Sequence, residues 1–268
     1  MTSWARRALD ILNVRIVWQG NAPPGAVTST LFVCNHISWL DILALLAVRP
    51  MRFVAKSEVR SWPIIGWMAM KTGTVFLRRN ECRYLAQVKR TIESALAHGG
   101  CIATFPEATT TDGITVRPFH SGLFESAVVS GATVWPVALR YYHSDGSLSK
   151  EAAFIGDQSL ISSLRRILRQ PVLNLAVSFG SPIAADGWER QELATAAYRA
   201  VTDMLKGQGQ LLHPELVLPV SSEEAYATPV VPQDPAARHP ARSAACVLAG
   251  DSGRRRRFRV GSKSACCL

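Results

Sequence analysis

The chain has 268 residues, of which 48% are hydrophobic, and its formal net charge is +10. That suffices for one sizeable core, and the basic excess suits a phosphate-rich partner: nucleic acid, an anionic lipid surface or a phosphorylated cofactor. Two features argue against other classes: no window holds the ~18 uninterrupted apolar residues of a membrane-spanning helix, and the six cysteines include no CxxC pair of the zinc-binding kind.

The first predicted element is an amphipathic helix within residues 1–20. Apolar side chains at Trp4, Ala8, Ile11 and Leu12 form a helical stripe flanked by arginines. Tryptophan, basic residues and an apolar face suit a helix lying on a membrane surface, but packing on the protein's own domain would explain the same pattern. Charges at Asp10 and Arg15 interrupt this stretch, so no secretory signal is predicted.

Residues 26–206 alternate short apolar strands with amphipathic helices. This alternation predicts a single α/β domain with a central, mostly parallel or mixed sheet flanked by helices. Pro136 lies in the fifth strand and argues for an edge, an end or a bulge. The segment Glu58–Met70 is either a core helix or an apolar surface facing acyl chains. The expected strands are 31–34, 51–55, 72–77, 101–105, 132–140 and 172–179, and the later helices include 119–130, 155–169 and 189–205.

The periodicity disappears from Gly207 onward. Proline, alanine, serine and glycine dominate, and Arg254–Arg257 form a basic run. This composition predicts a largely disordered basic tail over residues 207–268. Cys34 and Cys101 lie in apolar strands and are expected to be buried thiols, a usage that suits a reducing compartment.

A histidine and a carboxylate, His36 and Asp41, lie between the apolar runs 31–34 and 42–48. Burying both is costly unless they pair, and a paired imidazole is a general base of fixed tautomer. Positions five apart on a regular helix point about 140° apart, so His36 must precede the helix to meet Asp41. Ser38 and Asp41 also match a capping box, so Asp41 as a simple helix cap is the alternative.

Two more polar insertions follow predicted strands. Arg78 and Arg79 follow the third strand, and Glu107 with its threonine loop follows the fourth. Ligands of α/β sheets bind at the carboxyl ends of strands, so these groups are candidates for one site. Alone, the arginines could be a solvated pair and Glu107 a loop cap. No metal site is predicted.

Taken in order, these blocks resemble the glycerolipid acyltransferase family, which includes the 1-acylglycerol-3-phosphate acyltransferases. The resemblance covers residues 30–180. Ala108 stands where the family has glycine, which predicts φ < 0 or a less open loop there. Thr110 stands where many phosphatidate-forming members have arginine. The family's Asn-His-x4-Asp block is matched by Asn35, His36 and Asp41, its Gly-x-x-Phe-Ile-Asp-Arg block by Gly73, Phe76 and Arg79, its Phe-Pro-Glu-Gly-Thr-Arg block by Phe105, Pro106, Glu107 and Thr109, and its Val-Pro-Val-like strand by Trp135, Pro136 and Val137.

The resemblance implies transfer of a fatty acyl group from acyl-CoA or acyl-carrier protein to a lysolipid hydroxyl, with no further cofactor. The acceptor implied first is 1-acylglycerol-3-phosphate, giving phosphatidate; lyso-ornithine lipid or another lysophospholipid is the alternative. Backbone amides at the helix start or in the Phe105 loop would stabilise the oxyanion. The implied catalytic residues are His36 as base and Asp41 as its orienting partner, and the implied substrate-binding residues are Arg79, Arg78, Glu107, Thr109 and Thr110, with Glu107 either ordering its loop or accepting hydrogen bonds from acceptor hydroxyls.

The expected location is the cytoplasmic face of a membrane, through peripheral contact and without a specific nucleic-acid partner. Two other functions fit parts of the sequence. One is a non-catalytic basic protein that binds nucleic acid or anionic membrane through Arg254–Arg257. The other is a thioesterase-like hydrolase in which water replaces the acceptor. Cys34 is a rival nucleophile, although its apolar flanks indicate a core thiol.

Overall fold

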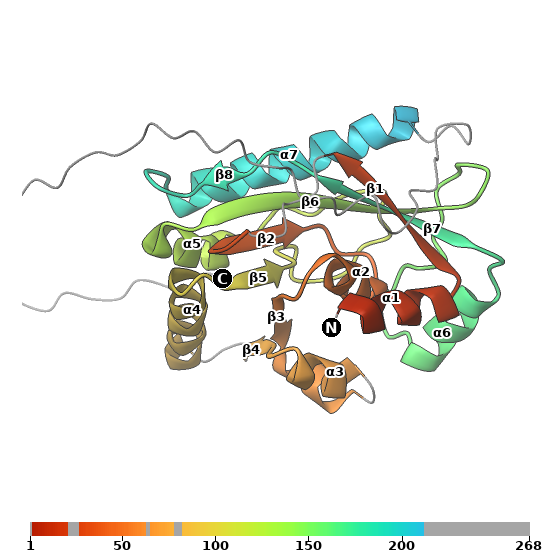
Figure 1. Cartoon of the computed structure of the whole chain (residues 1–268), viewed down its shortest axis with the longest axis horizontal. Helices are drawn as coiled ribbons and strands as arrows, with labels where there is room; N and C mark the ends of the chain where they lie inside the picture. The colour runs from red at the N-terminus through yellow and green to blue at the C-terminus, as the bar shows by residue number, and fades with distance from the viewer. Residues whose placement is uncertain (1, 21–26, 63–64, 78–81, 212–268) are drawn as a thin grey trace, which may run out of the picture.

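A central sheet of eight strands organises the computed structural model, which describes residues 2–20, 27–62, 65–77 and 82–211 (Figure 1). The strands are β1 (Val14–Gly20), β2 (Thr30–Cys34), β3 (Arg52–Lys56), β4 (Val75–Leu77), β5 (Cys101–Thr104), β6 (Thr133–Tyr142), β7 (Leu173–Phe179) and β8 (Ile183–Ala184). The helices are α1 (Thr2–Ile11), α2 (Leu40–Val48), α3 (Ile65–Lys71), α4 (Cys82–Ala97), α5 (Phe124–Ser130), α6 (Leu160–Leu168) and α7 (Arg190–Leu211), with 3-10 turns η1 (Ser57–Ser61) and η2 (Ser121–Leu123).

The sheet is mixed, with the order β1-β7-β6-β2-β5-β3-β4 and β8 paired to β6. Strands β6, β2, β5, β3 and β4 are mutually parallel, whereas β7 and β8 run antiparallel to β6. Helical connections between parallel strands place helices on both faces of such a sheet. The predicted α/β fold with a mostly parallel or mixed sheet is confirmed.

Alternation along β2 divides the core into two layers. Phe32 and Cys34 face a cluster that includes residues of α1, α2 and α6, whereas Leu31 and Val33 face a cluster built from α4, α5 and α7. Successive side chains of a strand point to opposite faces, so a strand buried on both sides is apolar throughout. Figure 1 shows α7 along one side of the sheet and α1, α2 and α6 on the other.

The predicted helix over residues 1–20 is wrong in its second half. The helix ends at Ile11, and residues 14–20 form β1, which pairs in parallel with β7. Its β-branched residues suit a strand. The predicted stripe also divides: Ala8 and Leu12 are half-buried against the domain, while Trp4 is 41% and Ile11 is 76% exposed. The fully buried residues of α1, Ala5 and Leu9, were not part of the predicted stripe. Helix α1 therefore packs on its own domain with one face and leaves another uncovered.

Two further predictions need correction. Pro136 lies in a central strand, at the point where the antiparallel partner of β6 changes from β8 to β7; Val134 pairs with Ile183 and Val137 with Phe179. This gap in the ladder accommodates a residue without an N–H. Helix α7 runs to Leu211, past the expected end at residue 205. The remaining predicted tail, residues 212–268, lies outside the described residues, and the domain limits stay a prediction.

No helix among the described residues has both the length and the apolar character to cross a membrane.

Candidate active site

Among the described residues, the His36–Asp41 pair and Glu107 meet as predicted at one end of the sheet. His36 follows β2 and Glu107 follows β5, and these neighbouring strands are parallel, so their carboxyl ends lie together. Strand β4, parallel to β3, ends at Leu77, immediately before the predicted arginine pair. Arg78 and Arg79 themselves lie outside the described residues.

His36 and Asp41 form the hydrogen-bonded pair that the spacing predicted. His36 precedes α2, and its Nδ1 lies 2.8 Å from Asp41 Oδ2. Asp41 is fully buried, in the first turn of α2. A carboxylate only accepts hydrogen bonds, so the proton of the neutral imidazole resides on Nδ1 and leaves Nε2 as an acceptor. The side chain of His36 is 18% exposed, which gives a substrate access to the ring.

Four donors satisfy the buried carboxylate of Asp41. Besides His36, the amides of Ile37 and Ser38 donate to Oδ2 at 2.7 and 2.9 Å, and the Tyr141 hydroxyl donates to Oδ1 at 2.7 Å. The helix begins one residue later than predicted, with Trp39 at the N-cap. The predicted capping role of Ser38 and Asp41 is nevertheless present, because Ser38 N donates to Asp41 and Ser38 Oγ accepts from Leu40 N at 3.4 Å. Asp41 thus fixes the turn before α2 and orients His36 with the same carboxylate.

Tyr141 and Asn35 hold this turn against β6. Burial, followed by the charge of Asp41, raises the pKa of Tyr141, which keeps the phenol protonated as a donor. The Asn35 amide donates to Leu139 O at 2.9 Å and accepts from Leu139 N at 2.8 Å. Tyr141 was not among the predicted site residues. Its sequence context, an aromatic residue in an apolar strand, is the ordinary pattern of a core position.

The Glu107 carboxylate orders the loop around His36. It is buried, and it accepts a hydrogen bond from the His36 amide on Oε1 and from the Arg117 amide on Oε2, each at 2.7 Å. Burial raises the pKa of Glu107, and these two amides oppose the rise. This is the geometry of the predicted loop-ordering role. Phe105, before it, stacks on the imidazole with ring centroids 3.9 Å apart.

The two predicted threonines differ in their contacts. The Thr110 hydroxyl donates to Phe154 O, so it joins the loop to the segment before α6. Thr109 is half-buried, and its side chain makes no hydrogen bond to a described residue. Their substrate-binding roles stay predictions.

Ala108 contradicts the expectation of a negative φ. Its φ is +58°, in the left-handed region where the family's glycine is free of strain. The chain needs this conformation because residues 105–108 turn back on themselves, with Ala108 N donating to Phe105 O at 3.0 Å. The loop therefore keeps the shape that glycine allows, at some cost in stability.

Replacing Ala108 by glycine is expected to raise the free energy of unfolding by about 0.5–1 kcal/mol, because the relief of strain exceeds the entropy that glycine adds to the unfolded chain. Urea unfolding followed by circular dichroism measures this change. Ala196→Gly in α7 is the matched control, where the same substitution should cost about 1 kcal/mol. A lower stability for Ala108→Gly would contradict the argument.

Cys34 is unsuited to act as the nucleophile. It is fully buried in β2, and its pKa is raised well above the usual range, first by burial and then by the charge of Asp41. Of the two predicted buried thiols, Cys34 is confirmed, whereas Cys101 is only half-buried. Within the part of the chain that the structure describes, no group of three or more His, Cys, Asp or Glu side chains could hold a metal ion.

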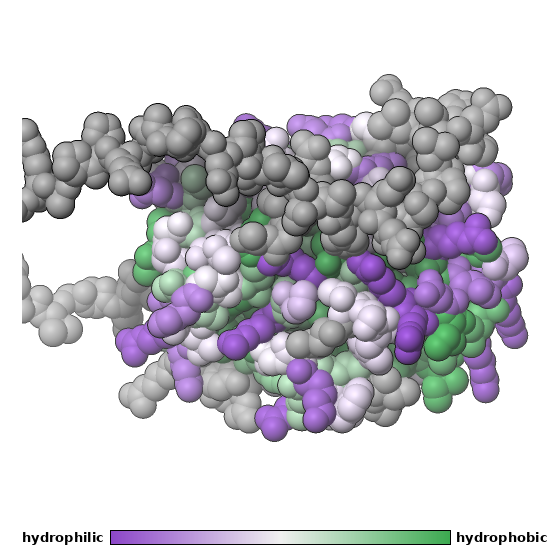
Figure 2. Space-filling model, in the orientation of Figure 1, coloured by the Kyte–Doolittle hydropathy of each residue, from purple (hydrophilic) through white to green (hydrophobic). Residues whose placement is uncertain are grey.

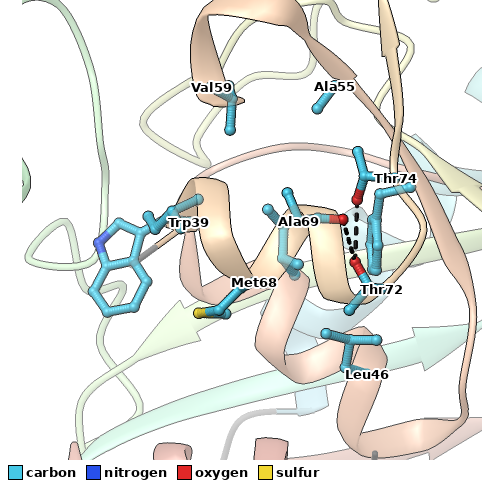
Figure 3. A pocket seen from close by; sticks show the side chains of 11 residues that line it. Trp39, Leu46, Ala55, Val59, Met68, Ala69, Thr72 and Thr74 are labelled. Atoms are coloured by element: carbon cyan, nitrogen blue, oxygen red, sulfur yellow. Dashed lines mark hydrogen bonds between the residues drawn. The ribbon is translucent and has the colours of Figure 1, made fainter. Parts of the chain in front are cut away.

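An apolar cavity of about 20 Å³ is lined in part by Trp39, which comes three residues after His36 in sequence (Figure 3). The segment Glu58–Met70 contributes to it through η1 and α3, while Trp67, on the other side of α3, is 55% exposed. The only hydroxyls in its lining satisfy each other: Thr72 Oγ1 lies 3.1 Å from Thr74 Oγ1 and also donates to Ala69 O. Its lining residues are Trp39, Ile42, Leu46, Phe53, Ala55, Val59, Ile65, Met68, Ala69, Thr72 and Thr74.

Comparison with known proteins relates this site to acyl transfer. The acyltransferase family profile matches residues 15–140. A lyso-ornithine lipid O-acyltransferase of Pseudomonas aeruginosa is 39% identical over 206 residues, covering 76% of this chain and 77% of that protein. A 1-acyl-sn-glycerol-3-phosphate acyltransferase of Neisseria meningitidis is 39% identical over 160 residues, 60% of this chain and 62% of that protein.

A solved structure has the same fold. The 1-acyl-sn-glycerophosphate acyltransferase PlsC from Thermotoga maritima aligns with a TM-score of 0.57 and 23% identity, over 77% of each chain. At this identity the likeness supports the fold alone.

Proposed function

The chain belongs to the acyltransferase family, and we propose that this O-acyltransferase moves a fatty acyl group from acyl-CoA or acyl-carrier protein to the hydroxyl of a lysolipid. The observation that carries the proposal is the pairing of His36 Nδ1 with a buried Asp41 carboxylate at 2.8 Å, which leaves Nε2 as the acceptor nitrogen. Nothing beyond the acyl donor is required as a cofactor.

In the proposed reaction, His36 Nε2 takes the proton of the acceptor hydroxyl while that oxygen attacks the thioester carbonyl. The tetrahedral intermediate then expels the thiolate, which receives the same proton from His36, so the imidazole is regenerated and no acyl-enzyme forms. A positioned base of this kind contributes about 10²–10⁴-fold to the rate. Asp41 stabilises the transient imidazolium by its charge.

Oxyanion stabilisation belongs to the loop after Phe105 in this proposal. The amides at the start of α2 are already committed, because Ile37 N and Ser38 N donate to Asp41. Removing one oxyanion donor typically costs about 10²–10³-fold in kcat. The loop that Glu107 and Thr110 hold beside His36 carries further backbone amides next to the imidazole.

For the acceptor, we favour lyso-ornithine lipid over 1-acylglycerol-3-phosphate. Phosphate recognition calls for arginine or lysine, and the loop from Phe105 to Thr111 contains neither. Thr110, at the family's arginine position, is bound to Phe154 O and is not directed at a head group. A P. aeruginosa lyso-ornithine lipid O-acyltransferase matches more of this chain than the Neisseria phosphatidate-forming relative does.

The acceptor brings the enzyme to a membrane, since a lysolipid resides there. We propose peripheral contact on the cytoplasmic face, where acyl-CoA and acyl-carrier protein are available. The apolar lining of the cavity next to Trp39 suits an acyl chain. Its volume of about 20 Å³ is close to that of a single water site, so an acyl chain would require α3 to move away from α2.

An acyl-transfer assay tests the function. Purified full-length protein, radiolabelled acyl-CoA and acyl-carrier protein, and a panel of lysolipids should give diacylated product, fastest with lyso-ornithine lipid. Faster reaction with 1-acylglycerol-3-phosphate would reverse the acceptor preference. Release of free fatty acid at the same rate without any acceptor would favour a thioesterase instead.

Arg79→Ala is expected to raise the KM for the acceptor more than His36→Ala does. Arg79 comes two residues after the end of β4 in sequence and is proposed to hold the acidic part of the head group, whereas His36 acts on the reacting hydroxyl. Steady-state kinetics with varied acceptor measures both constants, and Arg90→Ala on α4 is the control. Equal KM values for the two variants would remove the head-group role of Arg79.

A further inference from the structure

Helix α6 exposes apolar side chains that a water-facing helix would bury. Ile161 is 63% and Leu168 is 50% exposed, and both are large hydrophobic residues. The residues that α6 buries are Ser163 and Ile167, one of them polar. Helical spacing places Ile161, Leu164 and Leu168 on the same side, so these side chains form a stripe.

The arginines of α6 divide between the two sides. Arg166 is held on the inner side, where its guanidinium donates to the carbonyl oxygens of Glu151 and Ala153 at 2.7 and 2.5 Å. Arg165 and Arg169 are exposed beside the apolar stripe and take part in no ion pair with a described residue. The outer face of α6 therefore combines an apolar stripe with two available positive charges.

The inner side of α6, opposite the exposed stripe, contacts the catalytic turn. Trp39 Nε1, at the start of α2, donates to Ser163 Oγ at 3.1 Å. The segment that leads into α6 contacts the turn directly, because Phe154 N donates to Ile37 O at 2.9 Å. Trp39, three residues after His36 in sequence, therefore connects the turn directly to α6.

The exposed end of α1 lies close to the connection between α6 and β7. Leu173 N, just after α6, donates to Asn13 O at 2.9 Å, and Ile11 nearby is 76% exposed. Figure 2 shows hydrophobic surface over α6, at the lower right, bordered by hydrophilic side chains.

We propose that the outer face of α6, formed by Ile161, Leu164, Arg165, Leu168 and Arg169, docks the protein on an anionic lipid bilayer. A helix that presents an apolar stripe flanked by arginines inserts shallowly into the headgroup region, and each arginine is attracted by acidic lipid. Such docking would hold the His36 turn on the inner side of α6, one helix diameter (~10 Å) from the bilayer surface. This proposal rests on the proposed function, because docking on a bilayer serves an enzyme whose acceptor is a membrane lipid.

Binding of the full chain to vesicles tests the surface. The double variants Ile161→Gln/Leu168→Gln and Arg165→Gln/Arg169→Gln should each bind vesicles of phosphatidylglycerol and phosphatidylcholine about tenfold more weakly than the parent protein. Val129→Gln is the matched control, since Val129 is 65% exposed on α5, on the other face of the sheet. Parent-like binding of the double variants, or no binding by the parent protein, would overturn the proposal.

A position-specific measurement separates this face from the basic run Arg254–Arg257. Hydrogen exchange of the full chain, with and without vesicles, should slow in residues 160–168 and remain unchanged in 124–130. Unchanged exchange in 160–168 overturns the proposal even if the protein binds vesicles. If exchange in 160–168 slowed equally on self-association, or with an acidic carrier protein and no vesicles, the face would bind a protein partner. That result would also overturn the proposal.

Activity distinguishes this inference from the proposed function. The apolar double variant should keep its rate with detergent-dispersed lysolipid and lose it with lysolipid embedded in vesicles. If no lysolipid is acylated by the parent protein, the proposed function fails while the binding and exchange measurements still decide the docking face.

Discussion

His36→Ala is expected to lower kcat for acyl transfer by about 10²–10⁴-fold. The ring nitrogen Nε2 is the proposed proton acceptor, and His36 is the imidazole that hydrogen-bonds to the buried Asp41 carboxylate. The substitution removes one of the four donors to Asp41 and the ring that stacks on Phe105. Initial rates at saturating acceptor, measured with quantified diacyl product, give the change directly.

Two controls make this result specific to the base. His98→Ala removes an exposed imidazole that bonds only locally, to Ser94 O, and should leave the rate unchanged. Cys34→Ala removes the rival nucleophile and should keep kcat within about threefold, since a buried thiol of raised pKa does not react. If His36→Ala retained full activity, or if Cys34→Ala abolished it, the proposed mechanism would be wrong.

The central strands could be predicted from their strong hydrophobic pattern. Elements whose position depends on distant tertiary contacts could not. Strand β2 was predictable because it is apolar on both faces. Strand β1 was missed because its place in the sheet depends on pairing with β7, more than 150 residues away, and that pairing leaves little local pattern. Pro136 misled for a related reason: only the change of partner along β6 explains how a central strand accommodates it.

The residues of the candidate site also differ in whether the sequence alone could predict their contacts. The spacing of His36 and Asp41 predicted a contact outside the helix, and the 2.8 Å distance confirms it. The contribution of Tyr141 lies 100 residues away in sequence, and no local pattern marks it. At Ala108 the residue type pointed to a negative φ, but the hydrogen bonds of the loop impose a positive one. Residue identity is thus a weak guide where tertiary contacts determine the backbone.

Asp41→Asn is expected to lower kcat by about 10²–10⁴-fold and the free energy of unfolding by about 1–3 kcal/mol. Asparagine can keep its oxygen toward the His36 ring and the amides of Ile37 and Ser38, and the Tyr141 hydroxyl can rotate to accept from its amide group. The geometry therefore survives while the negative charge is lost. That charge is what stabilises the imidazolium formed as the acceptor hydroxyl loses its proton.

Tyr141→Phe separates the two effects of Asp41. It removes one donor from Oδ1 and leaves the charge, so unfolding should become easier by about 1–2 kcal/mol while kcat falls by less than about tenfold. Rates and urea unfolding for both variants, measured on the same preparations, give the comparison. A loss of kcat in Tyr141→Phe as large as that in Asp41→Asn would mean that the position of the carboxylate, not its charge, limits the reaction. Conversely, Asp41→Asn with near-normal kcat would mean that His36 needs only a hydrogen-bond acceptor at Nδ1, because the amide oxygen supplies one without the charge.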